Sequence, residues 1–213
     1  MANHENIIVG AANVFIGPAG DEYEIGIPDA PARVTEETLN EEVTEPAYRW
    51  ENVGLTQGGV EFAYAPDFGE VEVDQWLDVA KMYKQRQSVT VNTTFAEATL
   101  ENLLFAWGQP TETLDEDAAA GTRTLRISAG SLGDKPQERG LVFVGPAPDN
   151  GIERVYHLYR ALSVESSSHS LSRSDPTLVP VALRCLPSSQ EGGADVDYGV
   201  IIERFTATGE DGE

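Results

Sequence analysis

The residues best suited to chemistry in this sequence are its carboxylates. The chain of 213 residues carries 36 Asp and Glu against 14 Lys and Arg, a formal net charge of −22. Glu70, Glu72 and Asp74 alternate along one predicted strand, where alternate residues lie roughly 6.5 to 7 Å apart on one face. That separation suits the acid and base of a glycosidase. A chain with so many carboxylates contains such pairs by chance, so the spacing alone does not indicate an enzyme.

The other reactive side chains lack the spacing of a catalytic or metal site. His4, His157 and His169 are far apart and form no His-Glu-x-x-His motif, which zinc hydrolases use. Cys185 is the only cysteine, so no intrachain disulfide can form and we expect a buried thiol. The serines around His169 lack a Gly-x-Ser-x-Gly turn. The sequence predicts no catalytic residue, no metal site and no cofactor.

The charge of the chain limits its partners. An acidic surface repels a phosphate backbone, and the nearest approach to a basic cluster is Lys81, Lys84 and Arg86. We therefore expect no sequence-specific DNA binding. The first residues lack the basic region of a signal peptide, and no apolar run approaches the length of a membrane-spanning helix. We expect a protein that is soluble where it is made and has no membrane partner.

We expect strands to position the carboxylates and the other polar side chains, because apolar and polar residues alternate with period two along much of the chain. The clearest strand lies within 84–96. Its apolar face consists of Val89, Val91, Thr93 and Phe95, and its polar face of Ser88, Thr90, Asn92 and Thr94. Upstream, 60–64 and 68–75 are predicted to form an antiparallel hairpin around Pro66-Asp67. The carboxylates at 70, 72 and 74 would then share the wet face of that hairpin.

One helical pattern interrupts the strands. Leu100, Leu103, Leu104 and Trp107 follow i, i+3, i+4, i+7 spacing, and Thr99 is a suitable N-cap. Further strands are predicted at 7–16, 122–128, 140–145, 152–165, 178–186 and 198–205, with an acidic turn at 115–117. Many strands with one helix exclude a βαβ succession. We expect a mainly β fold, an antiparallel β-sandwich or open barrel with one short flanking helix.

The segment 19–50 does not follow this pattern. It is rich in Pro, Gly, Thr and acids, with ten carboxylates from Asp21 to Glu51 against Arg33 and Arg49. A connection of this length inside a compact domain is usually either disordered or committed to a partner. We expect a partner-binding arm whose residues 20–47 are mobile in the free chain. The whole chain, 1–213, is predicted to be one domain with a flexible tail at 206–213.

Several short stretches occur in a recognisable order. They are the strand ending at Gly17, the acidic segment, Trp50–Val60, Glu70–Gln75, Thr94–Leu103, Val179–Arg184 and Tyr198-Gly199. Each is a weak signal by itself, but together, over most of the chain, they resemble the major tail tube proteins of long-tailed bacteriophages.

The resemblance implies a structural virion protein. Six copies would close a ring in which inner strands of neighbouring copies form one barrel, and the rings would stack into the tail tube that conducts genomic DNA. The subunit would be assembled in the cytoplasm of the bacterial host, with the tape measure protein and the tail terminator as partners. Candidates for the channel wall are the wet strand faces: Glu70, Glu72, Asp74, Ser88, Thr90, Asn92 and Thr94. Candidates for contacts between rings are Asp21, Glu24, Glu36, Glu37, Glu41 and Glu42.

Three other functions are compatible with the residues. An acidic β-sandwich could be a binding module of a virion or cell surface, although aromatic residues make up only 8% of the chain and are dispersed. A tail terminator or head-tail connector would form a single ring that does not stack. A glycosidase would draw its two carboxylates from Glu70, Glu72 and Asp74.

Overall fold

The computed structural model of the chain is mainly β. It describes residues 10–21, 23, 25–29, 31–41, 43–45, 48–148, 151–165, 167–189 and 196–205. His4, Glu24, Glu42 and the predicted tail 206–213 lie outside these residues. The strands are β1 (Asn13–Gly17), β2 (Glu51–Asn52), β3 (Thr56–Val71), β4 (Lys81–Phe95), β5 (Leu114–Asp117), β6 (Thr122–Leu125), β7 (Arg139–Gly145), β8 (Gly151–Ser163), β9 (Val179–Leu186), β10 (Ser188–Ser189), β11 (Val196–Asp197) and β12 (Gly199–Phe205). The helices are α1 (Glu36–Leu39), α2 (Leu100–Ala106) and the 3₁₀ turn η3 (Thr111–Thr113).

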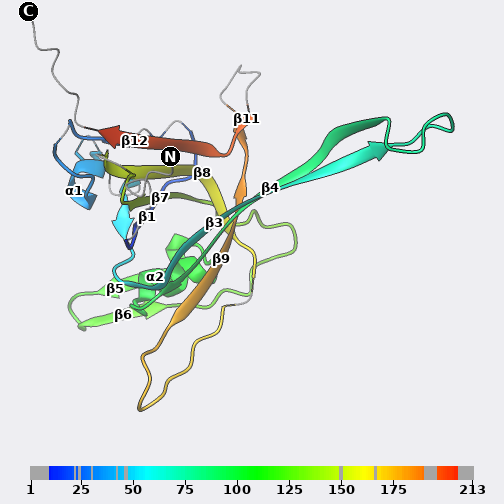
Figure 1. Ribbon diagram of the computed structural model, residues 1–213. Helices are drawn as coiled ribbons and strands as arrows, with labels where there is room; N and C mark the ends of the chain where they lie inside the picture. The colour runs from blue at the N-terminus through cyan, green and yellow to red at the C-terminus, as the bar shows by residue number, and fades with distance from the viewer. Residues whose placement is uncertain are drawn as a thin grey trace, which may run out of the picture.

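One antiparallel sheet of eight strands organises the molecule (Figure 1). Its order is β2-β1-β7-β8-β9-β4-β3, and β12 also pairs with β8. The long strand β8 pairs with β12 along 151–158 and with β9 along 160–163. The sheet therefore divides at β8 into a first wing of β2, β1, β7 and β12 and a second wing of β9, β4 and β3.

The two wings share the main hydrophobic core. Phe143 and Leu158 of the first wing belong to the same buried cluster as Val91 and Leu183 of the second, and α2 adds Phe105. Alternation along β4 and β9 leaves one dry face on the second wing, whereas β7 in the first wing is buried on both faces. The predicted antiparallel, mainly β fold with short helices is confirmed. Among the described residues no barrel closes, because β2, β3 and β12 each pair along one edge only.

A smaller core lies on the first wing and uses the acidic segment. Val34, Leu39 and Trp50 are each at most 3% exposed and cluster with Phe15 and Val142 of the sheet. Three apolar residues of the segment are thus part of a core, while the mobility of 20–47 in the free chain stays a prediction. The apolar residues of the segment are spaced so that α1 directs Leu39 to the sheet while Glu36 and Glu37 stay exposed.

Two predicted turns are wrong. The chain runs through Pro66-Asp67 without turning, because β3 is one strand of 16 residues that pairs with β4 from Thr56 to Val71. Pro66 is tolerated there because β3 is an edge strand, so its missing N–H faces no second partner. The predicted acidic turn at 115–117 is the strand β5, which pairs with β6.

The predicted helix is confirmed as α2, with Thr99 accepting a hydrogen bond from the Asn102 backbone N–H. Its buried face differs from the expected stripe. Leu104 and Phe105 are both 6% exposed, whereas Leu103 is only partly buried against the core. A second helix, α1, was not predicted, because it is only four residues long.

Candidate functional site

The most distinctive feature of the molecule is a hairpin arm, which we define as residues 64–87. β9 pairs with β4 only from Val89 to Phe95. Beyond Val89 only β3 and β4 pair with each other, and the resulting two-stranded ribbon projects from the body (Figure 1). The turn between the two strands spans 72–80. A two-stranded ribbon buries little surface of its own and is at best marginally stable when isolated.

The arm exposes large apolar and aromatic side chains to solvent. They are Tyr64, Phe68, Val71, Val73, Trp76, Leu77, Met82 and Tyr83. At the turn, Trp76 is 64% exposed and Leu77 is fully exposed. Contiguous exposed apolar groups on a soluble protein commonly mark an interaction surface. The arm therefore has the composition of a surface that a partner covers.

Contacts within the arm give the ribbon a defined shape. The Tyr83 ring covers Gly69 so closely that a Cβ at this position would lie 2.6 Å from a ring carbon. On the other face, the Lys84 ammonium donates to the Tyr64 hydroxyl at 2.8 Å and to the Gln87 amide oxygen at 2.7 Å. The register shifts between Asp67 and Phe68, and such a bulge bends and twists a ribbon.

The predicted carboxylate column does not exist as a strand face. Glu70 lies at the end of β3, opposite Met82, while Glu72 and Asp74 lie in the turn of the arm. All three are exposed. The strand predicted to end at Gln75 ends at Val71, because pairing with β4 stops there.

The polar face of β4 is confirmed as a face. Val89, Val91, Thr93 and Phe95 are buried, whereas the alternate residues Ser88, Thr90, Asn92 and Thr94 are partly or fully exposed. By register, Glu61 of β3 lies beside Asn92, and Arg184 of β9 lies beside Thr90. Glu70 falls on the opposite face of the ribbon from Ser88. The two sets of predicted wall residues are therefore not one surface.

Sequence reasoning missed Glu61 and Arg184 on this polar face. The Asn92 side-chain amide donates a hydrogen bond to Glu61 Oε2 at 3.2 Å. Asn92 and Glu61 line an open depression together with Gly58 and Gly59. Alternation within β3 could have placed Glu61 there. Only the pairing of β4 with β9 could have added Arg184.

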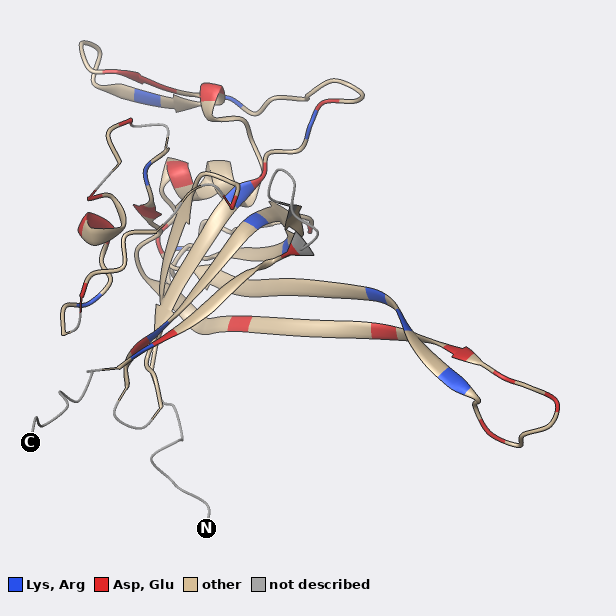
Figure 2. Ribbon diagram, turned by 90° about the horizontal axis from the view of Figure 1, so that it is seen from above, with Lys and Arg blue, Asp and Glu red and all other residues tan. Residues whose placement is uncertain are grey.

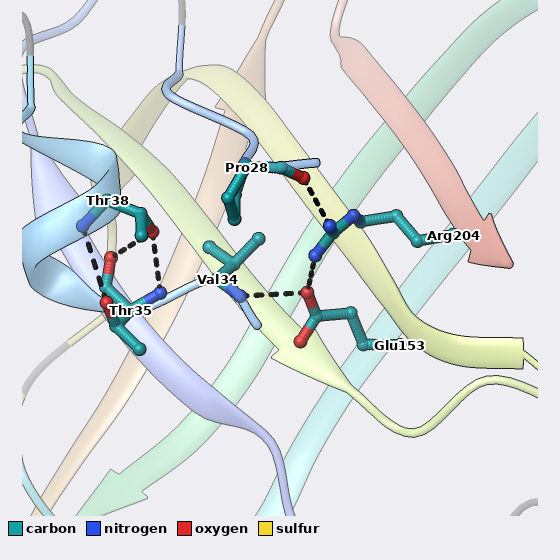
Figure 3. A network of polar contacts seen from close by, with 6 residues as sticks. All are labelled: Pro28, Val34, Thr35, Thr38, Glu153 and Arg204. Carbon is teal, nitrogen blue, oxygen red and sulfur yellow. Dashed lines mark hydrogen bonds and ion pairs between the residues drawn. The ribbon is translucent and has the colours of Figure 1, made fainter. Parts of the chain in front are cut away.

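The acidic segment is tied to the sheet by a buried polar network (Figure 3). Arg204 of β12 forms an ion pair with Glu153 of β8, and both side chains are at most 6% exposed. Glu153 Oε1 also accepts from the Val34 backbone N–H at 2.8 Å, and the Arg204 guanidinium donates to the Pro28 carbonyl oxygen. The network thus joins two strands to both sides of the turn before α1.

Of the predicted ring-contact residues, Glu36, Glu37 and Glu41 are exposed on or beside α1. Asp21 accepts a hydrogen bond from the Ser188 hydroxyl at 3.1 Å. Glu24 and Glu42 lie outside the described residues. Glu36, Glu37 and Glu41 therefore present exposed carboxylates on a segment that the core holds in place, whereas Asp21 is half-buried.

The two histidines that the structure describes, His157 and His169, pack against tryptophan rings. His157 is 4% exposed, lies edge-on to Trp50 with ring centroids 5.4 Å apart, and its Nε2 has no hydrogen-bond partner. Burial lowers the pKa of His157 to about 4, so the ring is neutral near pH 7. His169 stacks on Trp107 at 5.8 Å.

No cluster of metal-ligating side chains occurs in the described part of the chain. Burial raises the pKa of the Cys185 thiol to about 12, which suppresses its reactive thiolate form. None of the described helices is long and apolar enough to span a bilayer.

No protein-family model and no curated protein sequence matches the chain. Among solved structures, the chain is similar to one chain of a structure described as the "Virion of native gene transfer agent (GTA) particle". The two chains are 11% identical, and the match covers 74% of this chain and 89% of the other with a TM-score of 0.34. A TM-score of this size does not establish a common fold.

Proposed function

We propose that this chain is a structural subunit of a phage tail tube, which closes into hexameric rings that stack around a channel for DNA. The observation that carries the proposal is the arm. Its Trp76, Leu77, Phe68 and Met82 are not covered by any part of the chain that the structure describes, and an isolated two-stranded ribbon is at best marginally stable. Repeated copies that cover one another's arms stabilise the ribbon.

The free sheet edges favour assembly between copies. β12 pairs with β8 along one edge only, and its Val200, Ile201 and Phe205 are exposed. The edge strand β3 is free on the other wing. Unpaired strands with apolar side chains are templates for pairing with another chain. Two different free edges on one subunit permit a head-to-tail contact, which closes a ring when the rotation between copies allows it.

The polar face of β4 is the proposed channel wall. Ser88, Thr90, Asn92 and Thr94 are uncharged, and a neutral wall makes few ion pairs with phosphates, so it does not retain passing DNA. The acids at 70, 72 and 74 belong to the arm and are proposed to lie at contacts between copies. Arg184 of β9 lies beside Thr90 on this face, and Arg86 lies on the same face two residues before Ser88. The tape measure protein and the tail terminator are proposed as further partners.

Assembly of the purified protein tests the proposal. Concentrated protein should form rings or tubes in negative-stain electron microscopy. Trp76→Ser with Leu77→Ser should abolish them while changing the free energy of unfolding by less than about 0.5 kcal/mol, because both side chains are exposed. The matched control is Leu132→Ser with Leu171→Ser, which removes two exposed leucines outside the arm and should leave assembly intact.

The outcomes separate the alternatives. A protein that stays monomeric at millimolar concentration in light scattering contradicts the proposal and favours an acidic binding module. Single rings that never stack favour a terminator or connector. Hydrolysis of a panel of glycosides would instead point to an enzyme.

A further inference from the structure

A row of apolar and aromatic side chains crosses the first wing on its core side and is covered at one end only. Phe143 of β7 lies opposite Tyr156 of β8, and Tyr156 lies opposite Ile201 of β12. Phe62 of β3 packs on the first two, with ring centroids 6.2 Å from Phe143 and 5.9 Å from Tyr156. Exposure rises along the row from 4% at Phe143 to 52% at Ile201, with Tyr156 half-buried between them. The cover that Phe62 provides therefore ends before β12.

The exposed end of this row continues along β12. Phe205 lies on the same face as Ile201 by alternation and is 66% exposed. Between them, Glu203 forms an ion pair with Arg154 of β8, so the charges on this face cancel. We call Ile201 and Phe205 the β12 apolar face. No part of the chain that the structure describes covers it.

The layer of side chains that covers the row continues along the arm. Alternation along β3 places Tyr64 and Phe68 on the face of Phe62. Met82 of β4 joins them, because it pairs with Glu70 on the same face. We call Tyr64, Phe68 and Met82 the apolar face of the arm. Each of the three is about half exposed, so the arm extends the covering layer beyond the wing that it covers.

The two apolar faces do not cover each other within one chain. Both stay exposed, and the arm projects away from the body that carries β12 (Figure 1). Charge does not direct the arm to one site, because Figure 2 shows acidic and basic positions together along it. On its apolar face, Lys84 and Glu70 balance each other. Two acidic subunits can therefore meet at these two faces without like-charge repulsion.

We propose that the apolar face of the arm of one copy packs on the β12 apolar face of a second copy, as Phe62 packs on Phe143 and Tyr156 within one chain. This inference rests on the proposed function and names the surface that covers the arm. Each copy carries one face of each kind, so the contact is head-to-tail and repeats from copy to copy. Because the contact is apolar, sulfate should strengthen assembly.

Serine substitutions on either face test the inference with the full chain. The arm variant carries Phe68→Ser with Met82→Ser, and the β12 variant carries Ile201→Ser with Phe205→Ser. Each variant should need roughly tenfold more protein, or higher, to assemble, because it removes two apolar side chains from the contact. Thermal melts show that each variant is folded.

A matched control removes two exposed apolar side chains outside both faces. Ile127→Ser with Val164→Ser makes this change and should assemble at the same protein concentration as the wild type. Sulfate should lower the concentration that the wild type needs to assemble.

Disulfide cross-linking locates the contact without removing it. One chain carries Tyr64→Cys, Phe68→Cys or Met82→Cys, and a second chain, with a tag that changes its mass, carries Ile201→Cys or Phe205→Cys. Mixed, assembled and mildly oxidised, at least one pair should give a cross-linked heterodimer, because packed faces bring Cα atoms within about 7 Å. Tagged Leu132→Cys, at an exposed position elsewhere, is the control and should give none. Cys185 is buried and does not compete.

The outcomes separate the inference from the proposed function. A wild-type protein that never assembles removes both. Wild-type tubes, together with arm and β12 variants that assemble normally, overturn the inference and leave the proposed function standing. The inference also fails if no arm cysteine links to β12 in assembled tubes, or if the control position links as readily.

Discussion

Two ion pairs link β8 to β12, and they differ in burial. Arg204 and Glu153 have side chains that are 6% and 3% exposed, whereas Arg154 and Glu203 are 25% and 45% exposed. The buried pair also holds the Val34 amide and the Pro28 carbonyl. Its loss would leave several polar groups without partners in a dry environment, while water can replace the exposed pair.

We predict that Arg204→Met lowers the free energy of unfolding by about 3 to 5 kcal/mol, because it leaves Glu153 as an uncompensated buried charge. The matched control, Arg154→Met on the same pair of strands, should cost at most about 1 kcal/mol. Urea unfolding measures both. Hydrogen exchange at Val34 should accelerate in the first variant only, and equal losses in the two variants would contradict the role of the buried network.

His157 makes stability depend on pH. Burial lowers its pKa from 6.5 to about 4, so the unfolded chain binds a proton between these values and the folded chain does not. Stability should be full above about pH 6.5 and fall as the pH decreases toward 4, by about 3 kcal/mol in total from this residue. The variant His157→Leu should lose this part of the pH dependence. Identical melting-temperature slopes for both proteins between pH 7 and pH 4.5 would refute the assignment.

At the scale of elements, α2 packs through a different face from the one its helical pattern predicts. Phe105 is 6% exposed and packs on Phe95 with ring centroids 6.1 Å apart. Phe105→Ala should therefore cost about 3 to 5 kcal/mol through the cavity it leaves. Leu103→Ala, which affects only a partly buried side chain, should cost clearly less. Guanidinium unfolding measures both, and a larger loss for Leu103 would show that the helix packs through the predicted stripe.

The acidic segment behaves as an element of the fold. A Cβ at Gly17 would lie 2.5 Å from the Trp50 ring, and one at Gly140 would lie 2.8 Å from it. Strands β1 and β7 thus have a glycine at the positions where the Trp50 indole packs against them. Trp50 is further fixed through Asn40, whose side chain bonds both the backbone N–H and the carbonyl of Trp50. The segment covers part of the first wing and presents Glu36, Glu37, Glu41 and Glu45 to solvent.

At the scale of the whole molecule, the location of charge matters more than its sum. Electrostatic interactions are screened over about 8 to 10 Å at physiological salt, so only residues at a channel wall act on DNA. If the polar face of β4 is that wall, Thr90→Lys with Asn92→Lys and Thr94→Lys should preserve assembly and create DNA retention. Lysines at Thr122, Thr124 and Ser131, which are exposed on and after β6, provide a control of equal charge.

DNA binding to assembled tubes measures this prediction. Tubes of the β4 variant should retain DNA at low salt and release it as salt rises, because released counterions drive the contact. Wild-type and control tubes should not retain DNA inside the channel. If the β4 variant and the control retain DNA equally, the polar face of β4 does not line the channel.

The local pattern of the sequence determined the elements that depend on near neighbours. The alternation of Val89, Val91 and Phe95 defines the buried face of β4, and Thr99 with the leucines after it defines α2. These features follow from side-chain periodicity and capping, which act within a few residues. The mainly β, antiparallel class follows from their sum.

Only the tertiary structure shows which residues make contacts between distant parts of the chain. Val34 and Glu153 are 119 residues apart in sequence, and Glu153 and Arg204 are 51 apart, so no local pattern connects them. Likewise, Pro66 reads as a turn until β3 is known to be an edge strand, where a missing N–H costs nothing. The arm and the covered wing exist because each strand pairs with a partner that packing selects from the whole chain, and these contacts join residues far apart in sequence.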